Sequence, residues 1–179
     1  MAKTMLIPLM LILSINTANA QLGAMKMVGK NTKDYKLGFG LFIKTGLAVN
    51  EASDFTIEGG VNIFVLNDSY GSGSGTIMCP IKVGYRYTLN QTGEGFCVEP
   101  QAGFNVYGIT SMLDENGNAV DLKYHGVVLA AGTGYLFTLW NQPFDLNLRY
   151  ETVIAHGGSN NFVSLGISRF ISFKKHYAD

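Results

Sequence analysis

Apolar and polar residues alternate along most of the chain, which is the pattern of a β-strand whose two faces meet different surroundings. From Thr76 to Leu89 every odd position is apolar or aromatic, whereas the even positions include Lys82 and Arg86. Residues 55–65 and 144–154 alternate in the same way. Because helical periodicity is absent, the pattern predicts an all-β protein.

Five further segments complete a set of eight predicted strands. Four of them alternate less cleanly, and the first is a weak candidate. They cover residues 22–30 (the weak candidate), 36–49, 95–107, 120–139 and 161–173. Strands of about 10–13 residues match a tilted membrane crossing by a β-barrel.

The connections between the predicted strands form two alternating sets. One set is short: 50–53, 90–94 and 141–143. The other is longer on average: 31–35, 67–73, 110–119 and 155–160. Eight strands place both chain ends on the side of the short turns, as in outer-membrane barrels with periplasmic turns and longer extracellular loops. The prediction is an eight-stranded antiparallel up-and-down transmembrane β-barrel.

Charged residues of the predicted strands fall on the face opposite the aromatic residues. They are Lys44, Glu58, Lys82, Arg86, Glu99, Arg149 and Glu151. In a membrane barrel the apolar face points to lipid and the charges occupy the lumen, and eight strands leave an interior just filled by side chains. We therefore expect a lumen plugged by paired charges, with Arg86 beside the opposing Glu99. A catalytic or ion-selective cluster is the alternative.

Composition narrows the choice of function. The 179 residues suffice for one domain, and 13 Lys and Arg balance 13 Asp and Glu. A net charge of zero without a basic cluster argues against nucleic-acid binding. Two Cys are too few for a disulfide scaffold or a four-ligand zinc site. The sequence predicts no catalytic residues, no metal site and no cofactor, and hence no enzyme.

The first 20 residues have the features of a secretory signal peptide. Lys3 precedes an apolar run from Met5 to Leu13, and Ala18-Asn19-Ala20 follows. The run is much shorter than the roughly 20 residues of a spanning helix, so we expect cleavage before Gln21. The predicted domains are a signal peptide at 1–20, an outer-membrane barrel at 21–173 and a C-terminal tail at 174–179.

Three stretches carry a resemblance to a known family: the glycine-rich alternation of 36–42, the predicted fifth strand at 96–104 and the closing strand at 161–170. Together they resemble the small eight-stranded outer-membrane β-barrel family, often labelled "porin family" and similar in plan to OmpX- and OmpA-type barrels. The resemblance implies a monomer in the outer membrane, in contact with its lipid and lipopolysaccharide and inserted by the barrel-assembly machinery. Such chains commonly end on an aromatic residue. Here residues follow Phe173, so the assembly signal would be Phe170 or Phe173.

Two pairs of residues are weak candidates for a disulfide and for a hydrolase site. Cys79 and Cys97 would lie about eight residues apart along the predicted ladder, roughly 26 Å, whereas a disulfide needs Cα atoms within about 7 Å. His125 with Ser164 is a conceivable hydrolase pair, but no motif supports it.

Three functions stay open for a barrel of this kind. The first is a structural or surface-interaction role, the second a narrow porin or hydrophobic-solute channel, and the third a soluble lipocalin-like ligand-binding barrel. The short predicted loops leave no segment to build a constriction or a cap, which favours the first.

Overall fold

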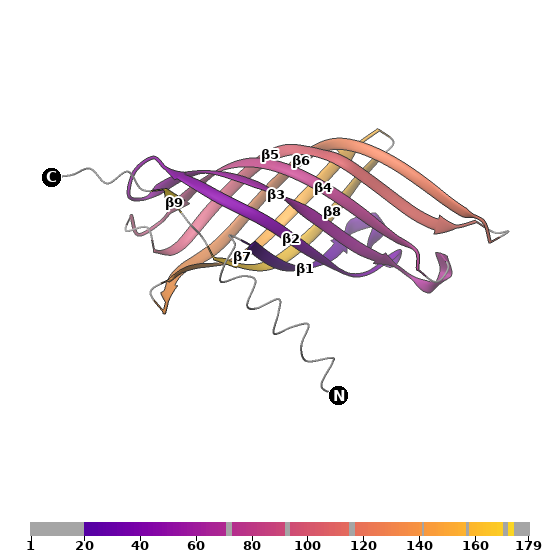
Figure 1. Cartoon of the computed structure of the whole chain (residues 1–179), viewed down its shortest axis with the longest axis horizontal. Helices are drawn as coiled ribbons and strands as arrows, with labels where there is room; N and C mark the ends of the chain where they lie inside the picture. The colour runs from indigo at the N-terminus through magenta and orange to yellow at the C-terminus, as the bar shows by residue number, and fades with distance from the viewer. Residues whose placement is uncertain are drawn as a thin grey trace, which may run out of the picture.

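The computed structural model describes residues 20–70, 73–91, 94–114, 117–140, 142–156, 158–169 and 172–173. Within these residues, eight antiparallel strands close into a ring, and a two-residue strand is added at one edge (Figure 1). The order is β1-β8-β7-β6-β5-β4-β3-β2, and the pairing of β1 with β2 closes it. The predicted up-and-down barrel is confirmed.

The strand bounds follow the predicted segments closely in the first half of the chain. They are β1 Ala20–Val28, β2 Tyr35–Ala48, β3 Ser53–Leu66, β4 Gly75–Thr88, β5 Gly95–Leu113, β6 Ala119–Leu139, β7 Gln142–Ala155, β8 Gly158–Arg169 and β9 Ser172–Phe173. Two short 3-10 helices, η1 Gly29–Lys33 and η2 Asp68–Tyr70, lie in described connections. No helix in the described part of the chain is long and apolar enough to cross a membrane.

The weak first strand is confirmed, and it begins one residue earlier than the predicted cleavage point. Ala20 already pairs with Ile43 of β2. The rest of the predicted signal peptide, residues 1–19, lies outside the described residues, as does the tail at 174–179.

Side-chain exposure follows the alternation. Ile57, Val83 and Leu148 are half exposed or more on the outer surface, whereas Glu58 and Lys82 are completely buried. The apolar face therefore points outward and the polar face inward. This is the arrangement predicted for a membrane barrel, and it is the opposite of a soluble lipocalin-like barrel.

One residue too many in β5 makes the alternation change phase. The register of β5 against β6 shifts between Asn105 and Gly108, which marks a β-bulge. His125 Nδ1 lies 2.7 Å from the Val106 carbonyl oxygen at this point. Strict alternation predicts Tyr107 on the lumen face, but the extra residue turns it outward, where it is 42% exposed. That part of the prediction is wrong.

The two ends of the barrel carry different sets of connections. The end at which β1 begins, and at which connections 49–52, 89–94 and 140–141 lie, is called the terminus rim. The other end is called the loop rim, and its connections are 29–34, 67–74, 114–118 and 156–157. The predicted loops 110–119 and 155–160 are wrong in extent. Backbone pairing continues past the end of the apolar alternation, because an antiparallel ladder needs no apolar side chain.

The predicted closing strand at 161–173 is divided. β8 ends at Arg169, and β9 pairs in parallel with Gly46 and Leu47 of β2. The β1–β2 pairing goes no further than Ile43, so β9 covers an edge of β2 that β1 leaves open. Of the two proposed assembly signals, Phe170 lies outside the described residues and Phe173 falls in β9.

Candidate functional site

A set of buried charges occupies the lumen on the side of the terminus rim, and we call it the charge layer. It arises because inward positions of β2, β3, β4, β5 and β7 carry ionisable residues at similar heights. Its members are Lys44, Glu58, Lys82, Arg86, Glu99, Asp145, Arg149 and Glu151, all buried. Four cations face four carboxylates, so the layer is neutral as a set.

Glu58 is the centre of one half of the charge layer. Its Oε1 lies 2.8 Å from Lys82 Nζ and 2.8 Å from Arg149 Nη1. Lys82 Nζ also lies 2.5 Å from Glu151 Oε2. Gln101 Nε2 donates to Glu58 Oε2 at 3.4 Å. One carboxylate thus holds two cations that belong to different strands.

Lys44 and Arg86 organise the other half. Lys44 Nζ lies 2.5 Å from Glu99 Oε2 and 3.3 Å from Asp145 Oδ2. Arg86 contacts the same Asp145 oxygen at 3.6 Å and Asp54 Oδ2 at 2.9 Å. The shared aspartate connects the two cations across the lumen.

Arg86 and Glu99 lie opposite each other on β4 and β5, as predicted. They do not form the predicted ion pair with each other. The pairing of Gly84 with Gln101 brings positions 86 and 99 opposite each other. The ion pairs of Arg86 nevertheless go to the two aspartates named above, and Glu99 pairs with Lys44. Sequence reasoning did not single out these aspartates, although both stand at inward positions of their strands.

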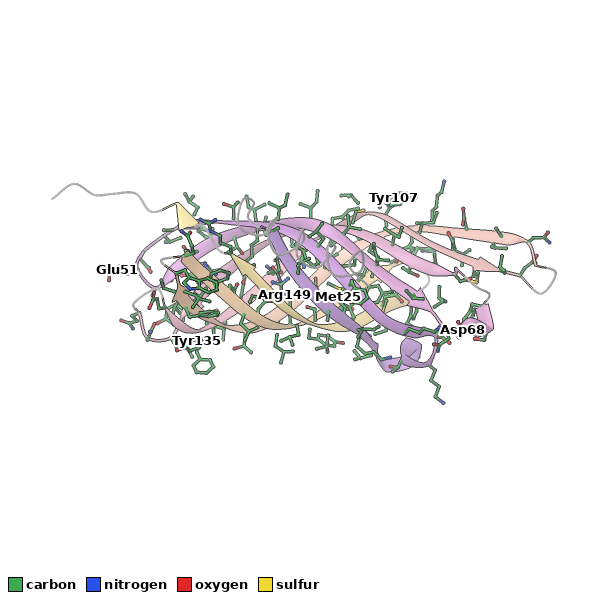
Figure 2. The ribbon with its side chains drawn as sticks, turned by 60° about the horizontal axis from the view of Figure 1, so that its bottom comes forward. Met25, Glu51, Asp68, Tyr107, Tyr135 and Arg149 are labelled. Carbon is green, nitrogen blue, oxygen red and sulfur yellow. The ribbon has the colours of Figure 1, made fainter. Side chains whose placement is uncertain are left out.

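A second layer of the lumen, on the side of the loop rim, is apolar, and we call it the apolar layer. Its members are Met25, Met27, Tyr35, Phe42, Phe64, Leu66, Met78, Val128, Val153 and Phe162. Lys82 Nζ lies 5.1 Å from the centre of the Phe42 ring, a cation–π contact that joins the two layers. Figure 2 labels Met25 and Arg149 in the middle part of the barrel, between Glu51 at one end and Asp68 at the other, and both side chains are buried.

Inward glycines make room for the aromatic rings of the apolar layer. A Cβ atom at Gly38 would stand 2.4 Å from Phe64 Cδ1, and one at Gly60 would stand 2.5 Å from Phe42 Cδ1. Larger residues at these positions would displace the rings. The glycine-rich alternation noted in the sequence therefore has a packing role.

Above the apolar layer, a cavity of about 870 Å³ opens at the loop rim, and we call it the rim pocket. Tyr35 and Thr110 belong to its lining, and Thr76 lies between them, with Oγ1 3.1 Å from Tyr35 Oη and 2.7 Å from Thr110 Oγ1. Other lining residues are Lys30, Met112, Leu122, Lys123, Tyr124, His156, Ser159, Asn160 and Asn161. No sequence motif marks this pocket, because its walls come from separate strand ends.

The weaker candidates are not assembled into sites. Cys79 and Cys97 are both free thiols, and they pair with Tyr107 and Thr88 rather than with each other. His125 is exposed at the bulge, whereas Ser164 is buried on the lumen face. In the described part of the chain, no group of three His, Cys, Asp or Glu residues is placed to hold a metal ion.

Comparison with known proteins gives matches in structure but not in sequence. No family model and no curated protein matches the chain. Ail of Yersinia pestis is 14% identical with a TM-score of 0.60, over 84% of this chain and 95% of Ail. Neisserial surface protein A is 15% identical with a TM-score of 0.51, over 84% of this chain and 93% of that protein.

A third match is the N-terminal β-barrel domain of Pseudomonas aeruginosa OprF. It is 14% identical with a TM-score of 0.52, over 85% of this chain and 97% of that domain. At such low identity the likeness concerns the fold. The chain has the fold of the small eight-stranded outer-membrane barrels, as its resemblance to that family implied.

Proposed function

We propose that this protein is a bacterial outer-membrane barrel with a structural or surface-interaction role and a lumen closed to bulk solute. The outward apolar belt and inward charges are the pattern of a barrel surrounded by lipid. The matching barrels include an attachment invasion locus protein and a surface protein. Under this proposal the protein acts through its loop rim and catalyses no reaction.

The observation that supports a closed lumen is that the charge layer and the apolar layer follow one another along the barrel axis. A hydrated ion moving along the axis would first have to separate buried ion pairs such as Lys82 with Glu151, which costs several kcal/mol per ion in a dry interior. It would then meet the rings of Phe64 and Phe162, whose centroids lie 5.2 Å apart. An apolar layer offers no partner to replace the lost water.

Orientation and partners follow from the same assignment. Short turns of such barrels lie in the periplasm and longer loops outside the cell, which would put the loop rim on the cell surface. The protein would then be a monomer that contacts outer-membrane lipid and lipopolysaccharide, after insertion by the barrel-assembly machinery.

A narrow water-filled channel is the second candidate, and one observation favours it. In the part of the chain that the structure describes, the side-chain amide nitrogen and oxygen of Asn62 and of Asn105 are buried without a hydrogen-bond partner. Buried polar atoms in this state commonly bind ordered water. Water beside these residues would hydrate part of the lumen. The apolar layer would still lie between that water and the loop rim.

Epitope insertion tests the proposed orientation. A short tag placed between Asn118 and Ala119, in the tip of the β5–β6 hairpin, should be labelled by antibody on intact cells. The same tag placed after Glu51, in a turn of the terminus rim, should be labelled only after the outer membrane is permeabilised. The opposite pattern, or recovery of untagged mature protein in the soluble periplasm, would contradict the proposal.

A further inference from the structure

A groove crosses β3, β4 and β5 on the outer surface of the barrel, and we call it the outer groove. Its volume is about 510 Å³, within the range of about 300–1,000 Å³ in which proteins bind small molecules. Ala102 lies opposite Val83 of β4 and has the smallest outward side chain of the lining, so it leaves room for the hollow. The outward residues that line the groove are Phe55, Ile57, Val83, Tyr85, Pro100 and Ala102.

Two aromatic rings form the end of the outer groove that is nearer to the terminus rim. The ring centroids of Phe55 and Tyr85 lie 5.4 Å apart at an interplanar angle of 67°, an edge-to-face contact that fixes both rings. The two side chains are 56% and 38% exposed. Outward residues at this height of a membrane barrel face hydrocarbon. The group that fits the outer groove is therefore an acyl chain.

A second hollow follows the outer groove at the terminus rim, and we call it the turn pocket. Its volume is about 410 Å³, and its lining residues are Asn50, Glu51, Ala52, Tyr87 and Gln91. Tyr87 is the next outward residue of β4 after Tyr85, a step of about 6.6 Å along the strand. The two hollows therefore follow one another on the same face of the barrel.

The lining of the turn pocket is polar, and its charge is negative. Glu51 is the one charged residue of this lining in the part of the chain that the structure describes, and Figure 2 labels it at one end of the barrel. Gln91 Nε2 donates to Tyr87 Oη at 3.5 Å, and Asn50 Oδ1 accepts from the Ala52 backbone N–H at 2.9 Å. A carboxylate beside amides and a hydroxyl suits an ammonium group, which donates several hydrogen bonds.

We propose that the outer groove and the turn pocket together bind one phospholipid of the periplasmic leaflet whose headgroup carries a primary ammonium. One acyl chain lies in the outer groove, and the ammonium lies against Glu51. The amide of Gln91 and the hydroxyl of Tyr87 contact the phosphate and glycerol oxygens. The proposal rests on the proposed function, which puts the terminus rim on the periplasmic side of a bilayer. A lipid that is anionic and has no ammonium would bring like charge to Glu51.

Native mass spectrometry of the mature chain, refolded in detergent micelles, tests this site. The protein is mixed with equal amounts of phosphatidylethanolamine and phosphatidylglycerol that have the same acyl chains. We expect one retained lipid per protein and at least about threefold more phosphatidylethanolamine than phosphatidylglycerol, because the ammonium meets a carboxylate. Equal retention of the two lipids, or several lipids per protein without preference, would overturn the proposal.

A matched pair of variants tests the outer groove. Ala102→Phe fills the hollow and should lower lipid retention at least about fivefold, because the acyl chain can no longer bury its apolar surface there. Ala24→Phe makes the same change at an exposed position of β1, outside the lining, and should change retention by less than about twofold. Both should keep the heat-modifiable band shift, since both positions are exposed. Undiminished retention by Ala102→Phe would show that the lipid lies elsewhere.

A second pair tests the headgroup contact. Glu51→Lys should reverse the preference in favour of phosphatidylglycerol by at least about threefold, because the ammonium then faces a like charge. Glu94→Lys lies in the next turn of the terminus rim and outside both linings, and it should leave the preference unchanged within about twofold. An unchanged preference in Glu51→Lys would overturn the assignment of the turn pocket. The epitope experiment tests the orientation separately, so failure of lipid selection and failure of the proposed function give different results.

Discussion

At the scale of single residues, depth in the membrane should decide the effect of a charge on the outer surface. Val83 is 57% exposed on the outward face in the middle part of the barrel. Val83→Arg should lower the free energy of unfolding from lipid vesicles by about 2–4 kcal/mol, whereas Leu89→Arg at the terminus rim should lower it by only about 0–1 kcal/mol. Urea titration of vesicle-folded protein measures both. Equal costs would mean that the outward face does not meet the hydrocarbon.

Glu58 offers a residue-level test of the charge layer. Its removal leaves Lys82 and Arg149 without the oxygen that both contact. Glu58→Ala should therefore destabilise the barrel by about 3–5 kcal/mol, as expected when one partner of a buried ion pair is lost. Asp68→Ala, which breaks an exposed pair with Lys36, should cost no more than about 1 kcal/mol. The same urea titration compares them, and similar costs would show that the charges are well hydrated.

The sequence was enough to predict on which face of its strand a charged side chain lies. It was not enough to predict which residue is its ion-pair partner. Parity alone puts Glu58 and Lys82 in the lumen, because side chains of a strand alternate. Partner choice depends on how far a long side chain reaches across the ring. Lys44 and Glu99 lie on strands that are not neighbours, and no local pattern relates residues so far apart in the chain.

At the scale of the strand, the bulge in β5 predicts an unusual tolerance of deletion. Removing Tyr107 would take away the one extra residue and leave Gly108 in its present register with β6. The variant should fold and show the heat-modifiable band shift of an intact barrel. Deletion of Phe104, in the regular part of β5, would turn the residues on one side of it to the wrong face. That variant should not fold, and the reverse outcome would contradict the bulge.

Strand boundaries were predictable where lipid imposes alternation and not beyond it. The terminus-rim turns lie within a residue or two of their predicted places. At the loop rim the hairpin of β5 and β6 continues to Leu113 and Ala119, and its residues 119–123 on β6 are exposed on both faces. Backbone pairing and a hydrogen bond from Ser111 Oγ to Asp121 Oδ1 hold that part, and neither leaves a hydrophobic period in the sequence. The separation of β9 from β8 was unpredictable for the same reason, since its partner Leu47 lies on a distant strand.

At the scale of the whole molecule, eight alternating strands and two sets of connections were enough to predict a closed barrel. The division of the lumen into a charge layer and an apolar layer was only partly visible, since Met25 and Met27 belong to the weakest predicted strand. The rim pocket was not visible at all. It exists because neighbouring hairpins differ in length, which is a property of the assembled ring and not of any one segment.

The central claim is that the two stacked layers close the lumen to bulk solute. Planar-bilayer recording on purified, refolded protein tests it directly. The wild type should show no steady open conductance above that of a protein-free bilayer. Glu99→Ala, which removes a partner of Lys44 but leaves the apolar layer in place, should lose stability without becoming conductive. A steady, large, ohmic conductance from the wild type would contradict the claim and make the channel the better description of this protein.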